Sequence, residues 1–384
     1  MRPDTLPPLF GLLVLVQVFM IFSVIGVISL ILTATNENRA NSSEVHDVQA
    51  RPPRVANFDE ARQLYLQKAN LLLANGKQAE AGANYIELGE ITQVHGLLPA
   101  AEAIYKKGIG LLKRSEQPND PRLVIALDDL GWLYITWGRV LDGARLLDQA
   151  RSKADLVQPD DPRLIRHLDT QAAYLLVEGK YSEAEKSWTQ ALDIGKMNYG
   201  PDSPEYDSIL VHYGQGSEIM GDYKNAEQLF QRYLAIEDRQ PPAEPSARAV
   251  AAGELARIYT ELHKYSQAQS WFNTATSIMN LDPDHAPLAR SIILSYLGDY
   301  YMAQGEWFKA QAPYRDALSI QQKVLGDNRA VAASMMSLSN ALKKLHLKDE
   351  AKDLVKRAQA ILSVQQKQNP LADETVDVMA LRRP

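Results

Sequence analysis

Gly179-Lys-Tyr-Ser-Glu-Ala184, followed by Trp188 and Ala191, is one copy of a pattern that returns at an almost constant interval. Successive turn positions of this pattern are 42, 41, 42, 42, 42 and 41 residues apart. They are occupied by Gly96, Gly138, Gly179, Gly221, His263, Gly305 and His346. A single long period of this kind is typical of proteins that stack one supersecondary unit on the next. The sequence therefore predicts about seven copies of one structural unit.

Each copy is predicted to contain two antiparallel helices. A small residue such as Ala184 lets two helices approach closely, and an aromatic residue four positions later, such as Trp188, fills the space beside the next pair. A helix that reverses within a few residues often ends in a left-handed conformation, which glycine adopts without steric cost. His263 and His346 occupy the same position, so we interpret them as turn residues and not as ligands.

The Leu-Gly-x-x-Tyr and Ala-x-x-x-aromatic patterns resemble the tetratricopeptide repeat, whose usual period is about 34 residues. The longer period here is similar to that of the kinesin-light-chain-like branch. Residues 191–204 and 317–327 resemble the second helix and the following loop of that branch. The resemblance covers about residues 80–362. It implies an all-α fold, a right-handed superhelical solenoid of about seven helix-turn-helix repeats, with a binding role and no catalytic residues.

The sequence departs from that branch at one position of the first helix. Members of the branch often carry an asparagine there, which holds the backbone of a bound peptide. In this chain the position holds Asp129, Thr170, His212, Glu254, Tyr296 and Ser337. The row of backbone-holding asparagines is therefore missing.

Composition and motifs argue against several other functions. The net charge of -6 over 384 residues gives no reason to expect nucleic acid, which needs a basic face to neutralise phosphates. The absence of cysteine excludes disulfides, thiolate catalysis and cysteine-bound metals. We find no HExxH, P-loop or dinucleotide motif, and the histidines do not form a cluster. We therefore expect no enzyme activity, no cofactor and no metal site.

Residues 9–32 contain 24 positions without a charged side chain, which is long enough to span a hydrocarbon core of about 30 Å. We predict one transmembrane helix that precedes the repeats. A cleavable signal peptide is the alternative, although Thr33-Ala-Thr35 makes a poor cleavage site. Inside the span, Gln17 and Gly26 are candidates for contact with another transmembrane helix, and Gln17 is equally well a tolerated polar residue.

The segments around this helix complete the predicted domain organisation. Residues 1–8 form an N-terminal tail, residues 33–57 a flexible stalk, residues 58–79 a capping helix and residues 363–384 a C-terminal tail. Charges on the two sides of the span are nearly balanced, so the orientation rests on the expectation that a short N-terminal tail stays inside. That orientation predicts a single-pass protein, for example of a bacterial inner membrane with the repeats in the periplasm, and a cytoplasmic orientation remains the alternative.

The concave side of the array is the predicted binding groove, lined by the first helix of each pair. The positions expected to face it are Asp128, Asp129, Trp132, Arg166, Asp169, His212, Gln215, Glu254, Arg257, Tyr296, Asp299 and Asn340. Exposed Trp132 and Tyr296 beside charges favour a polypeptide partner with some basic residues. In the alternative interpretation, Arg166 with Asp169, and Glu254 with Arg257, simply pair along one helix surface.

These observations predict a membrane-anchored scaffold that binds a protein or peptide partner in the groove, with lipid contacts through residues 9–32. A second interpretation is a structural or assembly subunit of a membrane protein complex. In that case the contacts would be made by the transmembrane helix and the outer repeat faces.

Overall fold

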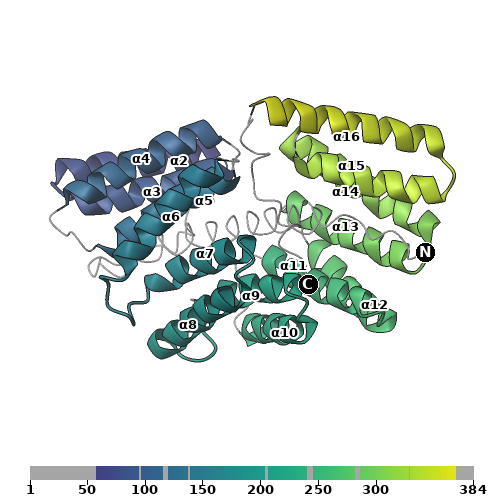
Figure 1. The fold of residues 1–384 in the computed structure, drawn as a ribbon, viewed down its shortest axis with the longest axis horizontal. Coiled ribbons are helices and arrows are strands. Elements are labelled where there is room, and N and C mark those ends of the chain that lie inside the picture. The colour runs from purple at the N-terminus through teal and green to yellow at the C-terminus, as the bar shows by residue number, and fades with distance from the viewer. Residues whose placement is uncertain are drawn as a thin grey trace, which may run out of the picture. The chain divides into compact units, whose positions relative to one another are not determined.

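A computed structural model describes residues 58–94, 97–115, 120–136, 139–203, 206–239, 245–281, 286–327 and 329–368 (Figure 1). Across these ranges the regular structure consists of fifteen α-helices. The predicted transmembrane helix over 9–32, with Gln17 and Gly26, lies outside the described residues, as do the N-terminal tail and the stalk. Within the described ranges, no helix combines the length and the apolar character needed to cross a membrane.

The chain divides into two compact units, and the boundary between Gln171 and Ala172 falls inside one helix. We call them the N-terminal unit and the C-terminal unit and describe each by itself. The N-terminal unit contains α2 (Phe58–Ala74), α3 (Gln78–Val94), α4 (Leu98–Arg114), α5 (Pro121–Thr136), α6 (Val140–Ala154) and the first half of α7 (Leu164–Val177).

The C-terminal unit contains the rest of α7 and nine further helices. These are α8 (Tyr181–Tyr199), α9 (Asp207–Ile219), α10 (Tyr223–Arg239), α11 (Pro245–Glu261), α12 (Tyr265–Met279), α13 (Pro287–Ala303), α14 (Trp307–Leu325), α15 (Arg329–Lys344) and α16 (Lys348–Gln368). The last of these helices extends into residues 363–384, which were predicted as a tail.

In chain order, α3 to α16 form seven pairs, and we call the odd-numbered members first helices and the even-numbered members second helices. Packing within the pairs α3–α4, α5–α6, α9–α10, α11–α12, α13–α14 and α15–α16 agrees with the predicted helix-turn-helix repeat. The additional helix α2 packs on α3, and Gly76 with a φ of 72° follows its end. The all-helical repeat architecture is thus confirmed.

The five predicted turn positions that the structure describes have the left-handed backbone, whereas Gly96 and Gly138 lie outside the described residues. The φ angles are 74° at Gly179, 81° at Gly221 and 73° at Gly305. His263 at 56° and His346 at 62° are the two described residues other than glycine with positive φ, which confirms their assignment as turn residues. At His263, the following amide of Lys264 donates to the carbonyl of Tyr259 at 2.8 Å, so the last carbonyls of α11 are satisfied.

Close helix contacts explain the small residues of the repeat. Ala184 and Ala226 are fully buried. A Cβ atom added to Gly216 would lie 2.2 Å from the Trp188 ring, and one added to Gly298 would lie 2.5 Å from the Tyr314 ring. These glycines therefore leave the volume that the aromatic rings fill, as the repeat pattern predicts.

Candidate functional site

The predicted groove residues all lie on first helices, but most of their side chains are buried. Arg166, Arg257 and Asn340 are half-buried, and Asp299 is exposed. Buried positions are Asp128, Asp129, Trp132, Asp169, His212, Gln215, Glu254 and Tyr296. Instead of a row of free side chains, the first helices carry polar groups that contact one another across neighbouring repeats. Whether these residues bind a partner remains a prediction.

The two aromatic residues differ from expectation. Trp132 and Tyr296 were expected to be exposed anchors, yet their exposed fractions are 8% and 4%. Tyr296 lies in an apolar cluster with Ala256, Tyr259 and Ile292. Spacing along one helix places these rings on the same face as the charged residues, but it does not reveal how closely the neighbouring helix packs against them. The expectation of exposed aromatic anchors at these two positions is therefore wrong.

In the N-terminal unit, one arginine connects three first helices. Arg166 Nη2 of α7 lies 2.6 Å from Glu90 Oε1 of α3 and 2.6 Å from Asp129 Oδ1 of α5. Beside it, His167 Nδ1 lies 2.8 Å from Asp128 Oδ2. We call Glu90, Asp128, Asp129, Arg166 and His167 the Arg166 cluster. It joins consecutive repeats through ion pairs and hydrogen bonds.

Burial strongly affects the protonation of this cluster. It raises the pKa of Asp129 well above its usual value, although the charge of Arg166 acts in the opposite direction. The neighbouring Glu90 and Asp128 carboxyl groups add to the increase. Burial also raises the pKa of Asp128, whereas the contact with His167 opposes that shift. The carboxyl groups of this cluster, Glu90 included, have little access to solvent.

In the C-terminal unit, Arg257 of α11 has the corresponding role. Its Nε donates to Glu254 Oε2 at 3.0 Å, and its Nη2 pairs with Glu218 of α9. Glu254 Oε1 accepts hydrogen bonds from Gln215 Nε2 of α9 at 3.3 Å and from the Tyr296 hydroxyl of α13 at 2.9 Å. We call Gln215, Glu218, Glu254, Arg257 and Tyr296 the Arg257 cluster. The predicted pairing of Glu254 with Arg257 is confirmed.

Negative charge dominates around the Arg257 cluster. Burial raises the pKa of Glu218 to about 8, and the nearby carboxylates of Glu254 and Glu261 also raise it, while Arg257 lowers it. Two further carboxyl groups belong to the same group of charges. The charge of Glu261 raises the pKa of Glu218, and the charge of Arg257 lowers that of Asp299. Both of these side chains reach solvent. Arg257 is therefore one cation among four carboxyl groups.

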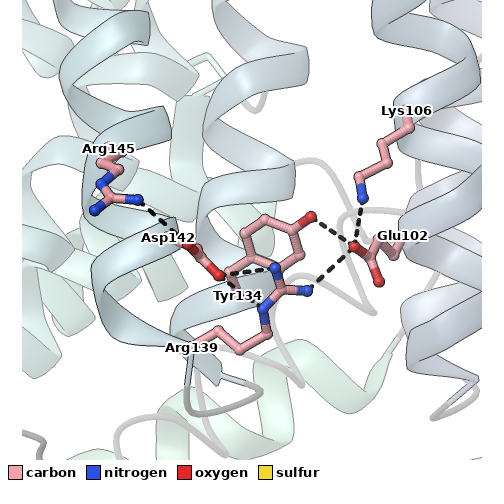
Figure 2. Close-up of polar contacts among 6 residues, drawn as sticks. All are labelled: Glu102, Lys106, Tyr134, Arg139, Asp142 and Arg145. Carbon is pink, nitrogen blue, oxygen red and sulfur yellow. Dashed lines mark hydrogen bonds and ion pairs between the residues drawn. The ribbon is translucent and has the colours of Figure 1, made fainter. Parts of the chain in front are cut away.

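A third polar group, shown in Figure 2, lies beside the turn region of the N-terminal unit. Glu102 Oε1 of α4 accepts from the Tyr134 hydroxyl at 2.6 Å, from Lys106 Nζ at 2.7 Å and from Arg139 Nη1 at 3.1 Å. The Arg139 guanidinium lies 3.9 Å from the centre of the Tyr134 ring and also pairs with Asp142. We call this the Glu102 network.

The Glu102 network has balanced charges. Burial raises the pKa of the Glu102 carboxyl, but its three hydrogen-bond donors outweigh burial and lower the pKa to about 2. Tyr134 and Glu102 come from consecutive repeats, as do Tyr259 of α11 and Glu227 of α10, whose hydroxyl and carboxylate also meet. These contacts fasten one repeat to the next, and they leave no surplus charge for a ligand.

Reasoning from the sequence missed Glu90, His167 and Glu218. Glu90 occupies the repeat position that holds Trp132 and Arg257 in later copies. Glu218 follows Gln215 by three residues and so lies on the same helix face. Applying the same positions to the first copy would have included Glu90, and extending them by one helical turn would have included Glu218. The contact of His167 with Asp128 had no such signal, because it depends on how two helices pack.

Comparisons with known proteins agree with the helical repeat architecture. The Tetratricopeptide repeat family matches residues 164–237 and 289–363. A search of curated proteins finds no match. Among solved structures, a Rap protein complexed with Competence and Sporulation Factor is 14% identical, with 88% of this chain and 92% of that chain covered and a TM-score of 0.55. BtubC (BKLC) from P. vanneervenii is 17% identical, with 61% and 94% covered and a TM-score of 0.50.

A further neighbour consists of TPR-like repeats assigned to a kinesin light chain of Podosopora anserina. It is 21% identical, with 54% of this chain and 98% of that chain covered and a TM-score of 0.42. At identities this low, the likeness to the Rap protein and to BtubC concerns the fold alone and does not indicate a ligand. The family matches agree with the repeat period and with the helix pairs. Residues 164–237 and 289–363 of this chain are tetratricopeptide repeats, and BtubC (BKLC) is among the solved structures that share its helical repeat fold.

Proposed function

We propose that this protein is a scaffold that binds a partner polypeptide on the face formed by its first helices. The observation that supports this most strongly is the set of contacts linking first helices of consecutive repeats, such as Gln215 to Glu254 and Tyr296 to Glu254. Side chains held in this way lose little conformational entropy when a partner arrives. The face is therefore organised for binding before the partner is present.

In each unit, the accessible groups on the first helices named here are polar and charged. Arg166 and Arg257 keep part of their guanidinium side chains accessible while they hold buried carboxylates. Asp299 and Asn340 add an exposed carboxylate and a half-buried amide. Backbone amides and charged side chains of an extended polypeptide suit such a surface. The Rap protein in the comparison, which was solved with a bound factor, supports the idea that this fold can carry such a ligand.

Site-specific photo-crosslinking tests this proposal. A photoreactive amino acid placed at Asp299 or Asn340 should crosslink a partner polypeptide in native membranes or extracts. The matched control is Asp316, an exposed residue of the second helix α14. If Asp316 forms the crosslinks and the two first-helix positions do not, the assignment of partner binding to the first helices is wrong.

A structural or assembly subunit is the second candidate function. It is favoured by large apolar side chains that are exposed outside the first helices, among them Phe308 at 78% and Leu281 at 80%. Such side chains suit a permanent interface when they gather in one patch. A chain starting at residue 58 and purified alone should stay soluble if it is a scaffold for transient partners. Aggregation that Phe308→Ser and Leu281→Ser relieve would favour the subunit.

We also propose that residues 9–32 anchor the protein in a membrane as a single-pass helix, with the repeats on the far side from the amino terminus, for example in a bacterial periplasm. The support is the length of this uncharged segment. A reporter fused after Pro384 should be active only on that far side. Activity on the cytoplasmic side would reverse the orientation, and release of the protein by alkaline carbonate would contradict the anchor.

A further inference from the structure

The C-terminal unit carries an excess of acidic groups at one place on its first-helix face. Glu254, Arg257 and Glu261 follow one another on α11 at spacings of three and four residues, so they lie on one face of that helix. Glu218 of α9 pairs with Arg257, and Asp299 of α13, whose carboxylate accepts a hydrogen bond from the Tyr314 hydroxyl, is acted on by the charges of Arg257 and Glu261. With all groups ionised, four carboxylates surround one guanidinium. We call Glu218, Glu254, Arg257, Glu261 and Asp299 the acidic site.

Two buried acceptor atoms in this region have no hydrogen-bond partner. They are Glu218 Oε1 and Gln215 Oε1, which belong to side chains that are 6% and 4% exposed. The second polar atom of each side chain contacts the Arg257 cluster. Glu218 Oε2 pairs with Arg257, and Gln215 Nε2 donates to Glu254. A buried acceptor without a donor is costly. The site therefore has both unmet negative charge and unmet acceptors.

We propose that the acidic site binds a cationic side chain of the partner polypeptide, an arginine or a lysine. This inference rests on the proposed function and names the chemistry of the residue that the first-helix face recognises. A guanidinium or ammonium group supplies the two things that the site lacks, which are positive charge and hydrogen-bond donors. Glu261 and Asp299 reach solvent, so they would attract the cation before it contacts the buried acceptors.

Other ligands fit this chemistry less well. An anionic ligand would face four carboxyl groups. Among the described residues, no group of three or more His, Cys, Asp or Glu side chains is arranged to hold a metal ion. Arginine should be preferred over lysine, because its planar fork can donate to two acceptors at once, whereas an ammonium group is a compact point charge.

The raised pKa of Glu218, about 8, agrees with this assignment. Without a second cation, the carboxyl group takes up a proton near neutral pH. A bound guanidinium group would favour the ionised carboxylate and displace that proton. Binding of a cationic residue is therefore expected to release a proton from Glu218.

The first test is selection from a random library of nine-residue peptides with the purified full-length chain. Enriched peptides should share an arginine or lysine at one position, and replacing that residue by glutamine should weaken binding. The double variant Glu261→Gln/Asp299→Asn removes two exposed carboxylates and should weaken binding of the best peptide by about tenfold, equivalent to about 1.4 kcal/mol. Asp316→Asn on α14 is the matched control and should leave binding unchanged.

The second test measures proton release by calorimetry in two buffers with different ionisation enthalpies at pH 7. The best peptide should release a proton on binding to the unchanged chain, and the amount should fall strongly for Glu218→Gln. The double variant keeps Glu218 and its contact with Arg257, so it reports on the charge of the site even if Glu218→Gln fails to fold. Binding should also weaken as salt concentration rises.

The outcomes separate this inference from the proposed function. Peptides selected without a basic residue, or held equally well by the double variant, would overturn the cationic assignment and leave peptide binding standing. No selected peptide at all would overturn both. If basic peptides bind only after residues 369–384 are removed, the site is occupied by this chain's own Arg382 and Arg383, and the assignment to a partner fails.

Discussion

The Arg166 cluster and the Arg257 cluster contain the same arrangement, an arginine paired with carboxyl groups, in two units of the chain. The Arg166 guanidinium holds carboxylates from α3 and α5, and the Arg257 guanidinium holds one from α9 and one from its own helix α11. The clusters differ in what surrounds that arginine. His167 contacts Asp128 within the Arg166 cluster, and its carboxyl groups are buried. Around Arg257, the further carboxylates of Glu261 and Asp299 reach solvent instead.

This difference separates a structural role from a binding role. Carboxyl groups that lie buried around a guanidinium hold neighbouring helices in register, and solvent has little access to them. Carboxylates at the surface next to buried acceptors can attract a cation from outside. The comparison therefore predicts that changes in the Arg166 cluster act on stability alone, whereas changes in the Arg257 cluster act on stability and binding.

Removal of the two arginines should have the largest effect. Arg257→Gln leaves Glu218 and Glu254 without their cation, and breaking a buried pair in this way is expected to cost about 3 kcal/mol. Arg166→Gln should cost less, because the Arg166 side chain is 39% exposed and the raised pKa of Asp129 lets this carboxyl group take up a proton when its cation is removed. Urea-induced unfolding of the two variants measures both losses.

The control for this experiment is Arg145→Gln, which removes a 3.8 Å contact of a largely exposed side chain and should change little. The loss in Arg257→Gln should be larger at pH 9 than at pH 7, because the Glu218 carboxyl, whose pKa is raised to about 8, is mostly ionised only at the higher pH. An equal loss in both cluster variants at every pH would mean that packing of the arginine stems, and not charge, holds the helices.

The sequence predicted the repeat better than the site. A period of about 42 residues, glycines at turns and small residues beside aromatic rings depend on local backbone and packing rules, so the helix pairs and the turn roles of His263 and His346 could be predicted. The burial of Trp132 and Tyr296 could not, because it depends on the distance between first helices of different repeats. The pairing of Arg166 with Glu90, which are 76 positions apart, has the same origin.

The second prediction concerns alkaline pH and the C-terminal unit. The pKa of Glu218 is raised from 4.5 to about 8, so the folded state binds this proton more tightly than the unfolded state. Its contribution to stability is fully present below about pH 4.5 and is lost as the pH rises towards 8. The urea midpoint should be lower at pH 8 than at pH 5, and Glu218→Gln should remove most of this difference.

The third prediction concerns acid and the N-terminal unit. The pKa of Glu102 is lowered from 4.5 to about 2, so the ionised carboxylate stabilises the folded state. This contribution is present above about pH 4.5 and is lost as the pH falls through 2, with a size on the order of 2 kcal/mol. Glu102→Gln should lower stability at pH 7 and reduce the loss of stability between about pH 4.5 and pH 2. Opposite pH responses of the two units would support the comparison, and parallel responses would contradict it.

The smallest effect is expected from two hydroxyl groups. The Tyr105 hydroxyl donates to the neutral amide oxygen of Gln93 at 3.0 Å, whereas the Tyr296 hydroxyl donates to the carboxylate of Glu254 at 2.9 Å. Hydrogen bonds to charged groups contribute more than neutral ones, so Tyr296→Phe should cost about 2 kcal/mol and Tyr105→Phe about 1 kcal/mol. Both rings are buried, and phenylalanine keeps their volume, so the difference reports the acceptor and not the packing.

The same pair of variants also distinguishes the two clusters by function. Without the Tyr296 hydroxyl, Glu254 loses a donor and the acidic site becomes more negative, so the affinity for a basic peptide should rise slightly while stability falls. Tyr105→Phe has no such link and should leave binding unchanged. Peptide affinity and urea midpoints measured on both variants test this. If Tyr105→Phe changes peptide affinity as much as Tyr296→Phe does, then the N-terminal unit takes part in binding and the division of roles between the two units is wrong.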